Sequence, residues 1–174
     1  FCGSGTIAIE AALIAKNKAP GMHRHFAAEV FPAVGAARFA AAREEAADLV
    51  TRTGFEVFAS DIDGEMVAAA EQNARAAGVA DTVRVFEADA RKIRADGRRG
   101  TIVTNPPYGQ RLGERRAVEA LYRDIGVRFR ALAPWQVYII TSDQEFEYYY
   151  GKRADKKRKL YNGMIKCNLH MYFK

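Results

Sequence analysis

The sequence has 174 residues, of which 49% are hydrophobic and 28% charged, with two cysteines and a formal net charge of +6. This composition is typical of a globular protein rather than a disordered chain, and no apolar run approaches the roughly 20 residues that cross a bilayer. The length predicts one domain, residues 1–174. Cys2 and Cys167 form no zinc-binding spacing or disulfide framework. We therefore expect a cytoplasmic protein with no metal site and no membrane partner.

Helical and strand-like patterns alternate along most of the chain. The expected helices lie at residues 4–16, 35–52, 67–77 and 118–132, and the expected strands at residues 55–63, 81–89, 100–105, 135–141, 157–161 and 164–173. The helix at 35–52 carries an apolar stripe, which predicts a packing role; it consists of Phe39, Ala42, Ala46, Leu49 and Val50. The helix at 118–132 carries one apolar face, formed by Val118, Leu121, Tyr122, Ile125, Phe129 and Leu132. The last two strands flank Asn162 and Gly163, an Asn-Gly pair typical of a hairpin turn. This order predicts an α/β protein with a doubly wound, mostly parallel sheet and a C-terminal antiparallel hairpin.

The first feature with chemical meaning is "CGSGT", which leads directly into the first helix. Small residues at such a turn let the backbone approach a ligand, and free amides at the helix start can hold an anion. The same pattern also occurs in plain tight turns and in dinucleotide-binding proteins. No strand precedes the glycines, so we expect a truncated chain whose first strand is missing.

Two carboxylates end the next two expected strands. Asp61 could accept both hydroxyls of a ribose, and Asp89 could accept a hydrogen bond from an adenine amino group. The structural alternatives are a helix N-cap near Asp61, a role that Asp63 fills more naturally, and a solvated strand end at Asp89. No lysine with Ser or Thr follows the glycines as in a P-loop, and a nucleoside with a carboxylate tail, such as S-adenosylmethionine, fits this set best.

The segment "NPPY", Asn105 to Tyr108, ends the strand at residues 100–105. An exocyclic amine of a nucleobase is a poor nucleophile, so it must be held and aimed. The Asn105 side-chain oxygen and the Pro106 carbonyl can each accept one N–H and direct the nitrogen lone pair at a methyl donor. Proline fixes the backbone and carries no competing N–H, while Tyr108 can stack on an extruded base. The structural alternative is a rigid turn.

At these residues the sequence resembles the amino-methyltransferase class of S-adenosylmethionine-dependent enzymes. It resembles more narrowly a family formerly described as N6-adenine-specific DNA methylases, whose characterised members are RNA guanine-N2 methyltransferases with an upstream THUMP domain. The blocks that carry the resemblance include "FCGSGTIAIEAALIAKNKAPG", "TNPPYGQRLG" and "KRKLYNGMIKC". The resemblance implies a Rossmann-like methyltransferase fold that lacks its first strand and the THUMP domain.

The resemblance also implies a role for each candidate site residue. Phe1 to Thr6 would surround the methionine part of S-adenosylmethionine, Asp61 would hold its ribose, and Ile62 and Asp89 would contact its adenine. The candidate catalytic residues are Asn105, Pro106, Pro107 and Tyr108. The candidate cofactor-binding residues are Phe1, Cys2, Gly3, Ser4, Gly5, Thr6, Asp61, Ile62, Asp89, Ala90 and Asn105.

The leading hypothesis is methyl transfer from S-adenosylmethionine to guanine N2 of RNA, with 23S ribosomal RNA as the expected partner. An N6-adenine DNA methyltransferase uses the same chemistry and is the first alternative. A non-catalytic RNA-binding or assembly module is the second. The basic run at residues 151–159 is expected to contact RNA phosphates, although lysines also protect a solvated strand edge.

Overall fold

The computed structural model describes residues 1–95, 97, 99–109 and 114–173. The chain divides into two units. Unit 1 contains Phe1, Ser60–Ile62 and Glu87–Lys174, and unit 2 contains Cys2–Ala59 and Asp63–Phe86. Within the described ranges, no helix combines the length and the apolar character needed to span a bilayer.

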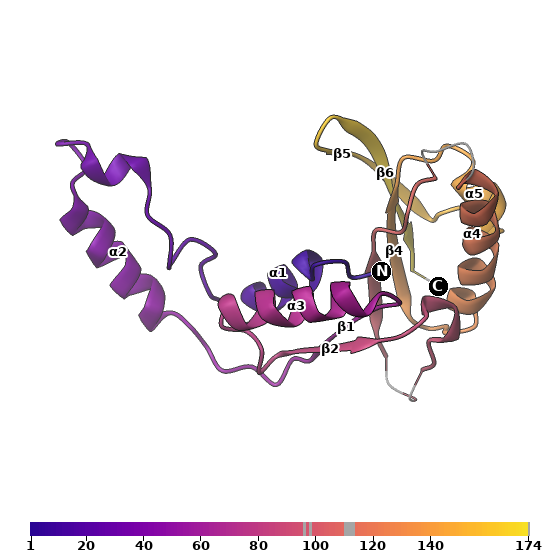
Figure 1. Cartoon of the computed structure of the whole chain (residues 1–174), viewed down its shortest axis with the longest axis horizontal. Helices are drawn as coiled ribbons and strands as arrows, with labels where there is room; N and C mark the ends of the chain where they lie inside the picture. The colour runs from indigo at the N-terminus through magenta and orange to yellow at the C-terminus, as the bar shows by residue number, and fades with distance from the viewer. Residues whose placement is uncertain (96, 98, 110–113, 174) are drawn as a thin grey trace. The chain divides into compact units, whose positions relative to one another are not determined.

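Unit 2 is built around two helices that lie side by side, α1 (Thr6–Ala15) and α3 (Gly64–Ala76) (Figure 1). The strands β1 (Val57–Asp61) and β2 (Val83–Glu87), which pair with each other, contribute most of their residues to this unit. Small and branched apolar side chains form the core, namely Ala8, Ile9, Ala12, Leu13, Ala59, Ala74, Val79 and Val83. The Asp63 side chain accepts a hydrogen bond from Glu65 N at 2.8 Å and so caps α3, as the sequence predicted.

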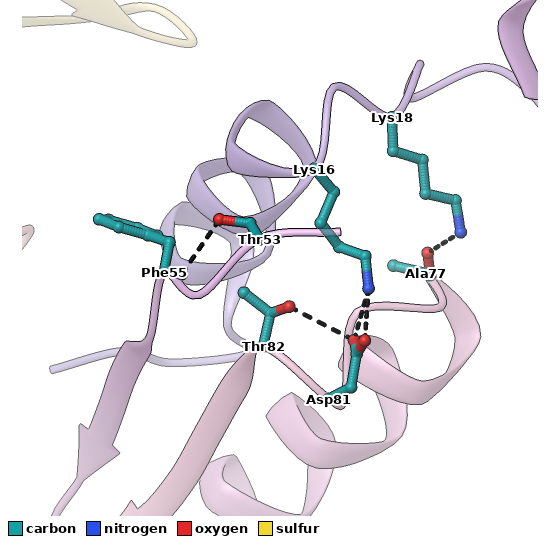
Figure 2. Close-up of polar contacts among 7 residues, drawn as sticks. All are labelled: Lys16, Lys18, Thr53, Phe55, Ala77, Asp81 and Thr82. Atoms are coloured by element: carbon teal, nitrogen blue, oxygen red, sulfur yellow. Dashed lines mark hydrogen bonds and ion pairs between the residues drawn. The ribbon is translucent and has the colours of Figure 1, made fainter. Parts of the chain in front are cut away.

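A polar cluster ties the end of α1 to the segments around β2 (Figure 2). The Lys16 ammonium contacts both carboxylate oxygens of Asp81, at 2.7 and 2.5 Å, and this contact lowers the pKa of Asp81. Lys18 Nζ donates to the Ala77 carbonyl at 2.8 Å and so satisfies a carbonyl at the C-terminal end of α3. The cluster is therefore explained by its structural role.

Helix α2 (Ala36–Asp48) lies apart from α1 and α3 (Figure 1) and contains no buried residue. The expected packing role therefore holds for only part of the apolar stripe, because Ala42 and Leu49 are exposed. Phe39 is partly covered because its ring stacks on Phe26 at 5.6 Å, next to the short 3₁₀ helix η1 (Ala27–Val30), and Ala46 and Val50 are also partly covered. Most apolar residues of α2 itself are alanines, and alanines gain little from burial.

Unit 1 contains a four-stranded sheet in the order β3-β4-β6-β5. Its strands are β3 (Thr101–Thr104), β4 (Gln136–Thr141), β5 (Lys156–Asn162) and β6 (Ile165–Tyr172). Strand β3 is parallel to β4, whereas β6 is antiparallel to both β4 and β5. The predicted C-terminal hairpin is therefore confirmed.

Helices α4 (Arg115–Arg130) and α5 (Phe146–Tyr150) pack on this sheet (Figure 1). Buried aromatic rings join them: Phe146 contacts Tyr122 of α4 edge-on at 4.9 Å, and Tyr150 lies 4.7 Å from Tyr172 of β6. The sequence predicted the apolar face of α4 correctly but did not predict α5 or the 3₁₀ helix η2 (Ala90–Lys92).

The hairpin turn differs by one residue from the expectation. Asn162 is still part of β5 and pairs with Ile165, so the two-residue loop is Gly163–Met164. Gly163 has φ of 60°, as the first central position of a type II′ turn requires. The consequence is that the Asn162 side chain projects from the strand itself.

Candidate functional site

The NPPY segment follows β3 and is hydrogen-bonded to helix α4. Asn105 is exposed, whereas the Pro106 side chain is fully buried. The hydroxyl of the buried Tyr122 donates to the Pro107 carbonyl at 2.9 Å and lies 3.0 Å from Thr141 Oγ1. Burial raises the pKa of Tyr122 to about 12, so its hydroxyl stays protonated and can act as a donor. One proline anchors the segment in the core while the amide beside it remains accessible.

Tyr108 lies next to this amide. It is half-buried, and its hydroxyl donates to Asn105 Oδ1 at 2.6 Å. An amide oxygen has two lone pairs, so Asn105 can still accept a second hydrogen bond. The structure therefore brings together the amide and the aromatic ring that the sequence singled out.

A cavity of about 310 Å³ lies in unit 1 beside Pro107. This volume is at the lower end of the range for small-molecule pockets, roughly 300–1,000 Å³. Its lining is mainly apolar, with two carboxylates and one guanidinium. The lining residues are Phe1, Ile62, Ala88, Asp89, Ala90, Arg91, Pro107, Ala117, Ala120, Leu121 and Asp124. Four predicted cofactor residues, Phe1, Ile62, Asp89 and Ala90, thus share one cavity with the NPPY segment.

Asp61 ends β1 close to this cavity without lining it. Its backbone carbonyl accepts a hydrogen bond from Ala88 N at 2.8 Å. The Phe1 nitrogen donates to the Ser60 carbonyl at 2.8 Å and lies 3.7 Å from Asp61 Oδ2. Asp61 directly precedes Ile62, which is 57% exposed and contributes to the lining.

Asp89 has a partner that the sequence reading did not anticipate. Its carboxylate accepts from Arg91 Nε at 2.9 and 3.0 Å, from Arg91 Nη2 at 2.7 Å and from Arg91 N at 2.9 Å. These hydrogen bonds lower the pKa of Asp89 to about 2. Asp89 also caps η2. An adenine amino group would therefore compete with Arg91 for the carboxylate oxygens.

The glycine turn belongs to unit 2. Gly5 N donates to the Cys2 carbonyl at 2.9 Å, and Asn73 Nδ2 donates to the Ser4 carbonyl at 2.9 Å. Gly5 is required here because its φ is 88° and because a Cβ would lie 3.0 Å from the Cβ of Ala70 on α3. This glycine therefore serves close packing as well as the turn. The ligand-binding roles of Cys2, Gly3, Ser4 and Thr6 stay predictions.

Sequence reasoning missed the contribution of α4 to the site. Ala117, Ala120, Leu121 and Asp124 line the cavity at helical spacing of three and four residues. The sequence placed Leu121 on the apolar face of this helix and gave it no role in the site. The signal was available, because these positions form one helix face next to the core face. The hydroxyl of Tyr122 was missed for a different reason, since periodicity predicts burial and not hydrogen bonding.

Three comparisons with known proteins agree with this description. Residues 1–171 match a family model described as RMKL-like, methyltransferase domain. The chain is 45% identical over 174 residues to the Bacillus subtilis (strain 168) protein named "Putative RNA methyltransferase YpsC". It is 38% identical over 178 residues to "Ribosomal RNA large subunit methyltransferase K/L" of Shewanella sediminis (strain HAW-EB3). It also matches the crystal structure of SMU.472 "complexed with SAH", with a TM-score of 0.93 and 40% identity.

Each match covers 99% of this chain, but only 45% of YpsC, 25% of the Shewanella protein and 46% of the SMU.472 chain. The similarity to SMU.472 confirms the predicted Rossmann-like methyltransferase fold. The chain belongs to the RMKL-like methyltransferase domain family.

Proposed function

We propose that this chain transfers a methyl group from S-adenosylmethionine to an exocyclic amine of a nucleobase, and that the acceptor is guanine N2 in 23S ribosomal RNA. The observation that carries the proposal is the state of the NPPY segment. The Asn105 amide is exposed at the end of β3, while the buried Pro106 and the hydrogen bond from Tyr122 to Pro107 hold the backbone behind it. A preorganised acceptor of this kind is what a weakly nucleophilic amine requires.

The cavity beside Pro107 fits the adenosine part of the cofactor. Ile62, Ala90 and Leu121 offer apolar surface for a flat ring, and Asp89 offers a carboxylate for an amino group once Arg91 yields one of its contacts. Arg91 is 45% exposed and so has room to move. Asp61, at the end of β1, would hold the ribose. When bound, S-adenosylmethionine supplies an electrophilic methyl group on a sulfonium.

The residues of the NPPY segment act on the acceptor base. The Asn105 oxygen and the Pro106 carbonyl accept the two N–H groups of the amine, which turns the nitrogen lone pair toward the methyl donor. The ring of Tyr108 stacks on the extruded base. The amine becomes acidic as it acquires the methyl group and a positive charge, so its proton can pass to water, and no strong base is needed beside Asn105.

RNA is favoured as the substrate by the names of the relatives and by strand β5. The side chains of Lys156, Lys157, Arg158 and Lys159 are all exposed on this strand. Lys157 is bound to Glu147 at 2.8 Å, and Lys152, which precedes the strand, lies 5.9 Å from the ring centroid of Tyr172. Lys159 Nζ likewise lies 5.4 Å from the ring centroid of Tyr161. Lys156 and Arg158 are therefore the better candidates for phosphate contacts.

The test is transfer of tritiated methyl groups to RNA and to DNA from cells that lack the corresponding methylation. We expect incorporation into undermethylated 23S ribosomal RNA and none with the Asn105→Ala variant. Incorporation into DNA alone would reject the RNA assignment and favour N6-adenine methylation. Binding of RNA without any incorporation would favour the non-catalytic alternative.

A further inference from the structure

The hydroxyl of Tyr108 is a meeting point of three side chains from different parts of unit 1. It lies 2.6 Å from Asn105 Oδ1, 3.4 Å from Asn162 Nδ2 and 3.7 Å from Cys167 Sγ. Asn105 follows β3, whereas Asn162 and Cys167 belong to the β5–β6 hairpin. Nothing in the catalytic roles described above uses Asn162.

The chemistry of the three side chains determines which of them donates and which accepts each hydrogen bond. An amide nitrogen is only a donor, so Asn162 Nδ2 donates to the Tyr108 oxygen. The phenol has one proton, which it therefore gives to Asn105 Oδ1. Burial raises the pKa of Tyr108, so this proton is retained at neutral pH. The carbonyl side of the Asn105 amide is thereby held toward Tyr108, and its second lone pair remains for another donor.

The hairpin register explains why Asn162 reaches this position. Asn162 pairs with Ile165 and Leu160 pairs with Cys167, and alternate residues of a strand point to the same face. Asn162 and Cys167 therefore face the same side. The β4–β6 pairing ends at Thr141 with Asn168, so the contacts with Tyr108 come from the part of the hairpin that extends beyond β4.

We propose that Asn162 is a positioning residue, which acts through the Tyr108 hydroxyl to fix the orientation of the Asn105 amide. The inference rests on the proposed function, because Asn105 is there the acceptor of the target amine. An amide free to rotate by half a turn would present its NH₂ group to the amine in part of the molecules. The same hairpin carries the exposed cations of β5, so RNA contact and amide orientation share one element.

The first arm of the test is kinetic and uses the purified enzyme. Asn162→Ala is expected to lower kcat for methyl transfer about 3- to 10-fold, the range of one net hydrogen bond, with KM for S-adenosylmethionine unchanged. Asn162→Asp is expected to lower kcat further, because a carboxylate accepts the Tyr108 proton and withdraws it from Asn105. Met164→Ala is the control, since this neighbouring loop residue is 98% exposed. Equal kcat values for wild type and Asn162→Ala would overturn the positioning role.

A double-mutant cycle distinguishes positioning from a general loss of structure. In the Tyr108→Phe background, Asn162→Ala is expected to have no further effect on kcat, because the connecting hydroxyl is already gone. Additive effects of the two substitutions would overturn the proposal.

The last arm needs no RNA and so is independent of the proposed function. The side-chain NH₂ resonances of Asn162 are recorded by ¹H–¹⁵N NMR in wild type and in Tyr108→Phe. We expect them to shift when the phenol oxygen is removed and to stay in place in Met164→Ala. Unchanged Asn162 resonances in Tyr108→Phe would refute the contact, whether or not the enzyme methylates RNA.

Discussion

Replacing Tyr122 by phenylalanine removes a single oxygen from the support of the NPPY segment. In the structure this oxygen is the middle of a chain of hydrogen bonds. Asp143 N donates to Thr141 Oγ1 at 3.1 Å, Thr141 Oγ1 lies 3.0 Å from the Tyr122 hydroxyl, and that hydroxyl donates to the Pro107 carbonyl at 2.9 Å. Tyr122→Phe therefore breaks two of the three contacts and leaves the ring in place.

The magnitude follows from where the two orphaned groups lie. Thr141 is completely buried, so water cannot replace the lost partner of its hydroxyl, whereas Pro107 is exposed and its carbonyl can be hydrated. A net hydrogen bond contributes about 0.5–1.5 kcal/mol, and a buried unsatisfied group costs about 1–3 kcal/mol. We expect the free energy of unfolding to fall by about 2 kcal/mol, together with a lower kcat for methyl transfer.

The assay is urea unfolding combined with initial rates. Tyr138→Phe is a matched control, because the Tyr138 hydroxyl donates to Gln136 Oε1 at 3.1 Å at an exposed position. The control should change the free energy of unfolding by less than about 0.5 kcal/mol. If Tyr122→Phe were no more destabilising than Tyr138→Phe, the hydroxyl would not support the segment as argued.

Three further predictions concern the acceptor amide, the basic strand and a buried imidazole. Asn105→Ala should abolish methyl transfer while the Kd for S-adenosylmethionine, measured by calorimetry, is largely kept; unchanged turnover would refute the role of the amide. Combined Lys156→Ala and Arg158→Ala should make the slope of log affinity against log salt shallower by about 1.4 for single-stranded RNA, and an unchanged slope would exclude phosphate contacts by these two residues. Burial lowers the pKa of His170 below 6.5, so the unfolded chain takes up this proton first. As the pH is lowered below about 6.5, the free energy of unfolding should therefore decrease by at most about 1.4 kcal/mol per pH unit. This decrease should be absent in His170→Phe.

Much of the fold could be predicted because the apolar periodicity of its elements is strong. The face of α4 and the C-terminal hairpin follow directly from residue spacing. Helix α2 was misjudged because an apolar stripe shows that a face can be buried, not that a partner covers it. The turn was placed one residue early because an Asn-Gly pair suggests a type I′ turn, whereas Gly163 and Met164 form the loop.

The candidate site was predictable in its residues more than in its contacts. The expected strands place Asn105, Asp61 and Asp89 at or near their carboxyl ends. Four predicted cofactor residues line one cavity. The ion pair of Asp89 with Arg91 was not predictable in the same way, because it depends on a side-chain conformation two residues along the chain. The contact between Asn162 and Tyr108 joins residues 54 positions apart, which no local pattern encodes.

The most direct test of the central claim is the identity of the methylated nucleoside. Undermethylated ribosomal RNA is treated with the enzyme and S-adenosylmethionine, digested to nucleosides and analysed by mass spectrometry against standards. The NPPY account predicts N2-methylguanosine, a product methylated on an exocyclic amine. Methylation of a ring nitrogen, a ring carbon or a ribose hydroxyl would contradict it.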